Sequence, residues 1–336
     1  MSSAIISSSG RAESASVIDW LLDSDPSVRW QVMRDVLATP EAEYRAERAR
    51  VETTGWGARL LAHEDEDGQW AGGAFLPHGF DFREWQEVGQ PFTATTFSLS
   101  QLREFGLDPS SDRINRAVEL IGAKSRWDHA DEPYWQGEVE ECINGRTVAD
   151  GAYFGVDVSA LADRLTGERL DDGGWNCERA NGSVRSSFDT TINVLEGLLE
   201  YERATGGTPT SREARKSGEE YLLQRGLFRR LSTGDPADEQ FLSFGYPSRW
   251  RYDVLRALDY FRSAGALTGV APDPRLGEAV DHVRSRRLAD GAWLLDWRLP
   301  GRVWFDLDDG PGKPSVWITL RAMRVLSWWD RAHGQR

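Results

Sequence analysis

Asp172-Gly173-Gly174-Trp175 is a short stretch that occurs, with small changes, three times in this chain of 336 residues. Its two distant copies are Asp67-Gly68-Gln69-Trp70 and Asp290-Gly291-Ala292-Trp293. The Asp-Gly pair favours a turn, because glycine readily adopts the positive φ that such turns need. The tryptophan that follows brings a large ring that can fix the turn against neighbouring helices. A recurring turn with similar flanks indicates a repeated supersecondary unit.

Amphipathic stretches flank these turns. Residues 186–201 place apolar side chains at steps of three and four, which is typical of an inner helix. Residues 111–122 and 275–287 mix charges with a narrow apolar stripe, which is typical of an outer helix. We therefore predict an all-α protein, an α/α toroid of about six helical hairpins. Its inner helices are expected near residues 27–38, 92–105, 147–163, 187–201, 248–262 and 315–328.

The ends of the predicted helices carry proline. Pro26-Ser27, Pro247-Ser248 and Pro314-Ser315 are each expected to begin an inner helix, because proline fits the first helical turn. Asp108-Pro109 and Asp273-Pro274 are expected to cap outer helices. Residues 1–12 are Ser-rich and predict a disordered tail, followed by one toroid domain over residues 13–336.

Composition limits the partners. The formal net charge of −14 argues against nucleic acid, which binds basic surfaces, and against an anionic membrane surface. No apolar run is long enough for a transmembrane helix. Two cysteines do not make a disulfide framework, so we expect a cytoplasmic protein.

The repeated turn resembles the Gln-Trp repeats of squalene–hopene cyclases and class II terpene cyclases, which are α/α toroids. The full repeat has Gln three residues before the Asp, where this chain has Glu64, Arg169 and Arg287. The resemblance implies a central cavity that takes a small hydrophobic isoprenoid, with no cofactor unless a diphosphate substrate brings Mg²⁺.

The chain also resembles the β subunit of protein prenyltransferases, which shares the toroid. Residues 144–154 and 311–319 are similar to the segments that supply the zinc ligands of that family. Asp150 keeps the Asp position, but Ala152 and Ile318 stand at the Cys and His positions. One carboxylate cannot hold zinc, which needs about four ligands, so we expect no metal and no protein prenylation. Whether a partner chain completes the site stays open.

Asp306-Leu307-Asp308-Asp309 has the spelling of the Asp-x-Asp-Asp motif of class II terpene cyclases. The resemblance implies that Asp308 protonates an alkene or epoxide, with Asp306 and Asp309 beside it. Flanking carboxylates raise the pKa of one member of such a group, which keeps it protonated. The alternative is a solvated acidic loop, since a Gly- and Pro-rich stretch separates the motif from the next helix.

Asp189 is the second candidate acid, at the start of the strong helix in 186–201. Short polar residues recur at comparable places, and together with aromatic rings they are expected to line the cavity. The predicted substrate-binding set is Asp150, Tyr153, Trp175, Trp250, Asp253, Trp317 and Thr191, with Thr95, Thr96 and Thr319 at similar positions. The alternative is that Asp, Ser and Thr only cap helices.

Cysteine and arginine provide further candidates. Cys142 and Cys177 precede successive inner helices and can approach each other, but a metal would need more ligands, such as His63, His78 or His129. Arg29, Arg34 and Arg249 can bind a diphosphate or form structural ion pairs.

Three functions follow from these observations. The first is a terpene cyclase-like enzyme in which Asp308 or Asp189 protonates a linear isoprenoid. The second is a non-catalytic binding protein on the same scaffold, and the third is a glycan-active α/α-barrel enzyme with paired carboxylates. The polarity of the lumen discriminates among them, because the fold alone does not.

Overall fold

A computed structural model describes residues 17–334, so the predicted tail over residues 1–12 lies outside the described part. Within that part the regular elements are helices, and strand-like pairing is limited to isolated bridges. The prediction of an all-α protein is confirmed. Among the described helices, none has the length and apolar character needed to cross a lipid bilayer.

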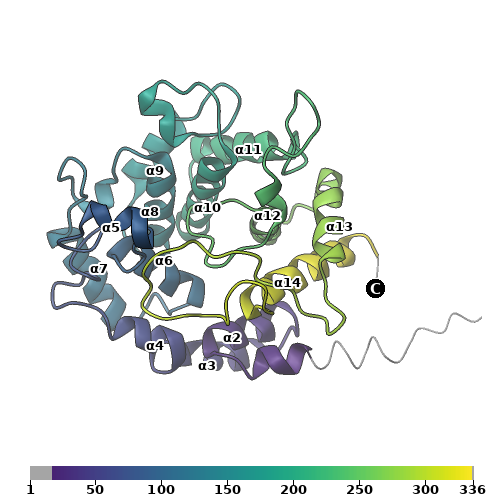
Figure 1. Cartoon of the computed structure of the whole chain (residues 1–336), viewed down its shortest axis with the longest axis horizontal. Coiled ribbons are helices and arrows are strands. Elements are labelled where there is room, and N and C mark those ends of the chain that lie inside the picture. Colours follow the sequence, from purple (N-terminus) through teal and green to yellow (C-terminus); the bar gives the residue numbers. More distant parts are fainter. Residues whose placement is uncertain (1–16, 335–336) are drawn as a thin grey trace, which may run out of the picture.

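Within residues 17–334, six inner helices form a closed ring (Figure 1). Each contacts the next along the chain, and the last contacts the first, so the two ends of the ring lie side by side. This contact confirms the predicted toroid. The inner helices are α2 (Pro26–Asp35), α6 (Thr95–Phe105), α8 (Glu141–Tyr153), α10 (Phe188–Thr205), α12 (Val254–Thr268) and α14 (Val316–Ala332).

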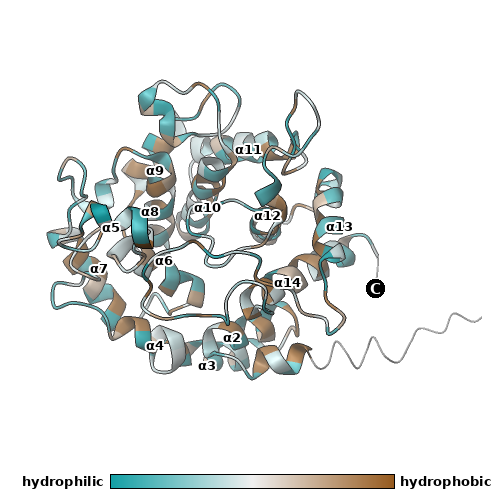
Figure 2. Cartoon of the chain, in the orientation of Figure 1, coloured by the Kyte–Doolittle hydropathy of each residue, from teal (hydrophilic) through white to brown (hydrophobic). Residues whose placement is uncertain are grey.

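Outer helices surround this ring, and in Figure 2 apolar and polar residues alternate along them, as expected where one face packs and the other meets solvent. They are α3 (Glu41–Ala49), α4 (Gly55–Leu61), α7 (Asp112–Lys124), α9 (Ser159–Gly167), α11 (Pro209–Leu223) and α13 (Gly277–Ser285). Short additional helices are α5 (Phe82–Val88), η1 (Arg50–Glu52), η2 (Tyr134–Gln136), η3 (Cys177–Asn181), η4 (Glu239–Leu242) and η5 (Pro274–Leu276).

The connections give the ring two different faces. Short links follow the C-terminal ends of inner helices, for example residues 206–208 between α10 and α11. Long loops lead from outer helices to the N-terminal ends of inner helices, for example residues 224–253 before α12. We call these the short-loop face and the long-loop face.

The repeated tryptophan joins an outer helix to an inner helix through two hydrogen bonds. The fully buried indole of Trp175 donates its Nε1–H to the Leu165 carbonyl of α9 at 2.6 Å. The backbone N–H of Trp175 donates to Thr191 Oγ1 of α10 at 3.1 Å. We call this pair of bonds the tryptophan clasp. It recurs for Trp70 with Leu60 and Thr95, and for Trp293 with Val283 and Thr319.

Glycine is required at the second position of this turn, and in the Trp175 copy a second glycine follows it. The second residue of each copy has a φ between +84° and +104°, which other residues rarely adopt. At Gly174 a side chain would place Cβ only 2.4 Å from Thr191 Oγ1, so a larger residue would displace the threonine of the clasp.

Two predicted inner helices have different boundaries. The one expected near 147–163 is wrong, because α8 ends at Tyr153 and the chain turns through Gly155 (φ +78°) into α9. The one expected near 248–262 begins too early. Residues 247–250 form a loop, and α12 begins after Asp253, whose side chain accepts the Arg256 N–H at 2.8 Å.

The proline predictions have mixed outcomes. Pro26 does begin α2, after an Asp25 cap, and Asp273 caps η5. Pro314 lies one residue before the Ser315 cap of α14. Asp108 does not cap α7, because its carboxylate accepts the Ser110 N–H in a preceding turn and Ser111 takes the cap position.

The clasp predicts a stability effect. Trp175→Phe keeps an aromatic ring but removes the indole N–H that donates to the Leu165 carbonyl, and Thr191→Val leaves the buried Trp175 N–H without its side-chain acceptor. We expect each change to lower the free energy of unfolding by about 1–3 kcal/mol, measured by urea denaturation. The exposed control Trp20→Phe should change it by less than about 0.5 kcal/mol. Equal small effects at all three positions would show that the clasp does not stabilise the fold.

Candidate functional site

An aromatic-walled cavity of about 370 Å³ opens on the long-loop face, at the N-terminal ends of α8 and α10. We call it the aromatic cavity. Its volume lies in the range of about 300–1,000 Å³ that is usual for small-molecule sites. Its lining residues are Phe75, Trp85, Gln90, Phe97, Glu140, Cys142, Ile143, Arg146, Cys177, Ser187, Asp189, Thr190 and Trp250.

Asp189 is the candidate acid that lines this cavity. Ser187 caps α10, which places Asp189 in its first turn and half-buried. Asp189 Oδ1 accepts the Tyr252 N–H at 2.7 Å. Burial raises the pKa of this carboxyl, although that hydrogen bond and two nearby arginines act in the opposite direction. A larger fraction of Asp189 is therefore protonated at a given pH than for a carboxyl on an open surface.

The acidic motif lies in the loop over residues 297–314, which we call the crossing loop because it passes across the ring (Figure 1). Asp306 is exposed and pairs with Arg298, and Asp309 is also exposed. Asp308 is half-buried and accepts the Ser315 hydroxyl at 3.0 Å. Burial raises the pKa of Asp308 to about 7, and the charge of Asp309 adds to this effect.

Space beside Asp308 is small. The pocket that Asp308 lines holds about 20 Å³, and the adjacent pocket beneath the crossing loop holds about 30 Å³. About 10–15 Å³ of such space holds one water molecule, so each pocket fits only a few waters and no organic substrate. Asp308 has the raised pKa of an acid but no room for an isoprenoid beside it.

The crossing loop is fixed over the lumen. The Phe92 N–H donates to the Arg302 carbonyl at 2.7 Å, and Trp304 stacks on His63 with ring centroids 4.1 Å apart. Below it, Trp317 stacks on Tyr246 at 4.7 Å. Stacked aromatic rings thus lie at and beneath the crossing loop, and each face of the ring carries its own cavity.

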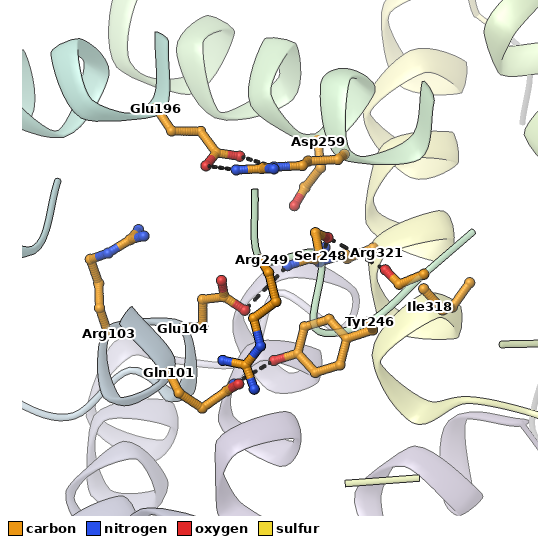
Figure 3. Close-up of polar contacts among 12 residues, drawn as sticks. Gln101, Arg103, Glu104, Glu196, Tyr246, Ser248, Arg249, Asp259, Ile318 and Arg321 are labelled. Atoms are coloured by element: carbon orange, nitrogen blue, oxygen red, sulfur yellow. Dashed lines mark hydrogen bonds and ion pairs between the residues drawn. The ribbon is translucent and has the colours of Figure 1, made fainter. Parts of the chain in front are cut away.

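The cavity on the short-loop face is polar and charged. We call it the arginine basin, with a volume of about 520 Å³. Arginines there form ion pairs, such as Arg256 with Glu196 at 2.7 Å and Arg103 with Asp150 at 2.7 Å. Tyr153 lines it, and its hydroxyl donates to the Leu107 carbonyl. Figure 3 shows several of these groups at the centre of the ring.

Several predicted ligand-contacting residues instead have structural partners. Trp175 and Thr191 are fully buried within the clasp, so neither lines a cavity. Asp150 is fully buried between Arg103 and the Ser100 hydroxyl. Asp253 is a buried helix cap, and burial raises its pKa to about 6. Only Trp250 of this set lines the aromatic cavity, while Trp317 and Tyr153 line the arginine basin.

The three arginine candidates behave differently. Arg29 pairs with Glu47 and Arg34 with Asp35, as the ion-pair alternative predicts. Arg249 has no carboxylate partner among residues 17–334, and its guanidinium lies over the Phe92 ring at 4.8 Å. Figure 3 shows it beside Tyr246 and Gln101. Burial and, to a smaller extent, the positive charge of Arg146 lower its pKa to about 10.

Cys142 and Cys177 do approach each other, as the sequence predicts. Their sulfur atoms and a carboxylate oxygen of Glu140 all lie within 4.8 Å of one another. None of the histidines proposed as further ligands belongs to this cluster. Sequence reasoning missed Glu140, Phe75 and Trp85, because none of them belongs to the repeat: Trp85 lies on the short helix α5, and the other two lie in loops.

Comparisons with known proteins add little beyond architecture. No protein-family model matches the chain, and no curated protein matches it. Solved structures similar to it include a polysaccharide lyase (12% identity, TM-score 0.49, covering 98% of this chain and 99% of that one). A type II terpene cyclase from Scytonema, in complex with geranylgeranyl dihydroxybenzoate, is 13% identical, with a TM-score of 0.46 and coverage of 98% and 97%. A protein from Actinoplanes is 14% identical, with a TM-score of 0.45 and coverage of 94% and 99%. The assignment of the toroid rests on the chain's own helix contacts.

The raised pKa of Asp308 predicts a pH effect on stability. The native state holds this proton up to about pH 7 and the unfolded chain loses it near pH 3.8, so ionisation destabilises the fold as the pH rises between these values. Asp308→Asn should remove this loss. We expect the free energy of unfolding of the variant, relative to that of the wild type, to rise by about 1–2 kcal/mol from pH 5 to pH 8. This figure is reduced from the full pKa shift because solvent partly screens Asp308. Urea denaturation at pH 5 and at pH 8 measures the free energy of unfolding of both proteins. A difference between variant and wild type that is the same at the two pH values would show that Asp308 is not protonated at pH 5.

Proposed function

We propose that this protein is a terpene cyclase-like enzyme that binds a linear isoprenoid in the aromatic cavity, where Asp189 acts as the general acid. One observation carries the proposal: the aromatic cavity places a half-buried carboxyl among aromatic rings in a volume that suits a small molecule. No comparable space adjoins Asp308.

The chemistry needs an acid that is protonated and shielded from water, because an alkene is a very weak base. Asp189 transfers its proton to one alkene carbon, and the positive charge appears on the neighbouring carbon. A second alkene of the same chain attacks that carbon and closes a ring. Loss of a proton ends the reaction, so no oxidant or reductant is consumed.

Aromatic faces stabilise the cation during these steps. Trp250, Phe97 and Trp85 come from three separate segments of the chain and line the same space. Arg146 also lines it and can bind an anionic group of the substrate, such as a diphosphate. Mg²⁺ is needed only for such a substrate.

The rim of the cavity also favours an apolar substrate. Trp85 lies on α5 at the cavity wall and is 38% exposed, and Phe82 on the same helix is 67% exposed. Their rings stack at 6.3 Å with an interplanar angle of 8°. Exposed aromatic rings beside a cavity offer an apolar surface over which a hydrocarbon chain can enter.

The arginine basin supports a second candidate function. It is larger than the aromatic cavity, and ionised side chains line it. Such walls fit an anionic or sugar-like ligand, as expected of a binding protein or a glycan-active enzyme. Most of its arginines already hold protein carboxylates, so this function ranks second.

The proposal is tested by incubating the protein with linear isoprenoid diphosphates and squalene-type hydrocarbons and separating the products by mass-resolved chromatography. Asp189→Asn keeps an acceptor for the Tyr252 N–H but removes the acid, so we expect cyclic product to fall by roughly 10²–10⁴-fold. Asp306→Asn is the matched control and should retain activity, because Asp306 is exposed on the crossing loop.

Loss of product in Asp308→Asn with full activity in Asp189→Asn would move the acid to the crossing loop. Absence of turnover with every isoprenoid, together with binding of uronic acid oligosaccharides, would favour the second candidate.

A further inference from the structure

Glu140, Cys142 and Cys177 form a cluster of metal-ligating side chains at one wall of the aromatic cavity. Glu140 precedes α8, Cys142 is the second residue of α8, and Cys177 begins η3. Cys142 Sγ lies 3.5 Å from Glu140 Oε2. Both cysteines are free thiols, and they are the only two in the chain.

All three groups of this cluster become negatively charged when they ionise. Among the described residues, Glu140 forms no ion pair, although the nearby Glu141 pairs with Arg179. Two thiols and a carboxylate within 4.8 Å repel each other once they ionise. A divalent cation removes this repulsion and uses all three groups as ligands.

Cys177 is held in place from two sides. The Thr190 hydroxyl donates to Cys177 Sγ at 3.2 Å and accepts the Cys177 N–H at 3.1 Å. Cys177 also follows two residues after Trp175, whose clasp fixes the turn to α9 and α10. Hydrogen bonds of this kind orient the ligands of protein metal sites and sustain their affinity.

We propose that Glu140, Cys142 and Cys177 bind one divalent transition metal ion, and that Zn²⁺ fits this ligand set best. Two thiolates and one carboxylate suit zinc, which binds sulfur and oxygen in four-coordinate sites. Three protein ligands leave the fourth position for a water molecule or for an oxygen donor of a ligand in the aromatic cavity, such as a hydroxyl or phosphate oxygen.

This site reverses the expectation of no metal, and it lies apart from the position that the resemblance to prenyltransferases indicates. That resemblance points to Asp150, which lies near the other end of α8 and is paired with Arg103. The proposed site is at the N-terminal end of α8. It does not depend on proton transfer from Asp189, so its test uses no activity measurement.

The test is a Co²⁺ titration of the full-length, reduced and chelator-treated protein, followed by absorption spectroscopy. We expect one equivalent to bind with a thiolate-to-cobalt charge-transfer band, and one equivalent of Zn²⁺ to abolish the band. Cys142→Ser and Cys177→Ser should each weaken the band and reduce affinity. Thr190→Val should reduce affinity by roughly 10–100-fold while both thiolates still bind.

Two further variants control for misfolding and for nonspecific carboxylate binding. Glu140→Gln changes an exposed residue, so it should keep the helical circular dichroism spectrum and still bind Co²⁺ more weakly. Glu132→Gln, on an exposed loop without an ion pair in the described chain, should match the wild type. A wild-type protein without the charge-transfer band, or a Cys142→Ser/Cys177→Ser double variant with undiminished Co²⁺ affinity, would overturn the proposal. So would a reduced protein that binds no metal and forms a Cys142–Cys177 disulfide in air.

Discussion

The tryptophan clasp is the interaction on which the rest of the structure depends. Each indole donates to a carbonyl of an outer helix, and the same residue's backbone N–H donates to a threonine of the following inner helix. A buried N–H without a partner costs free energy, so the buried indole and backbone N–H groups of each tryptophan fix the two helices relative to each other. Three copies distributed around the ring hold α6, α10 and α14 against their outer partners, and the contact between α14 and α2 then closes the toroid.

In this ring the residues that stabilise the fold differ from those that line the cavity. The clasps lie where outer helices turn back toward inner helices, so the long loops that leave these turns can vary without disturbing the ring. The aromatic cavity is built from these loops and from the first turns of α8 and α10. Cys177 lies just beyond the Trp175 turn, and Asp189 lies in the first turn of α10. The clasp fixes both of these segments, so it also holds the two side chains in place. Trp317 and Tyr246 stack beneath the crossing loop, and the aromatic cavity lies at the side of the long-loop face.

The repeat and its helical periodicity were enough to predict the all-α toroid, because turns and apolar spacing are local features that survive in the sequence. Helix ends were less predictable: Pro247 precedes a loop, since Asp253 supplies the cap that starts α12. Among the predicted site residues, Asp189 and Trp250 line the aromatic cavity, whereas Thr191 and Trp175 form the clasp. Short polar residues at helix starts look alike in sequence whether they cap, clasp or face a ligand. Glu140 and Trp85 were missed because only tertiary packing brings the loop before α8 and the short helix α5 to the cavity.

The central claim is that the aromatic cavity, and not the lumen or the arginine basin, receives the ligand. The most direct measurement is a crystal structure of the protein with a saturated analogue of farnesyl diphosphate, which has no alkene for Asp189 to protonate. The account predicts electron density for the hydrocarbon chain between Trp250, Phe97 and Trp85, with the carboxyl of Asp189 beside it. Density in the arginine basin, or beside Asp308 under a displaced crossing loop, would contradict the account and place the functional site elsewhere in the ring.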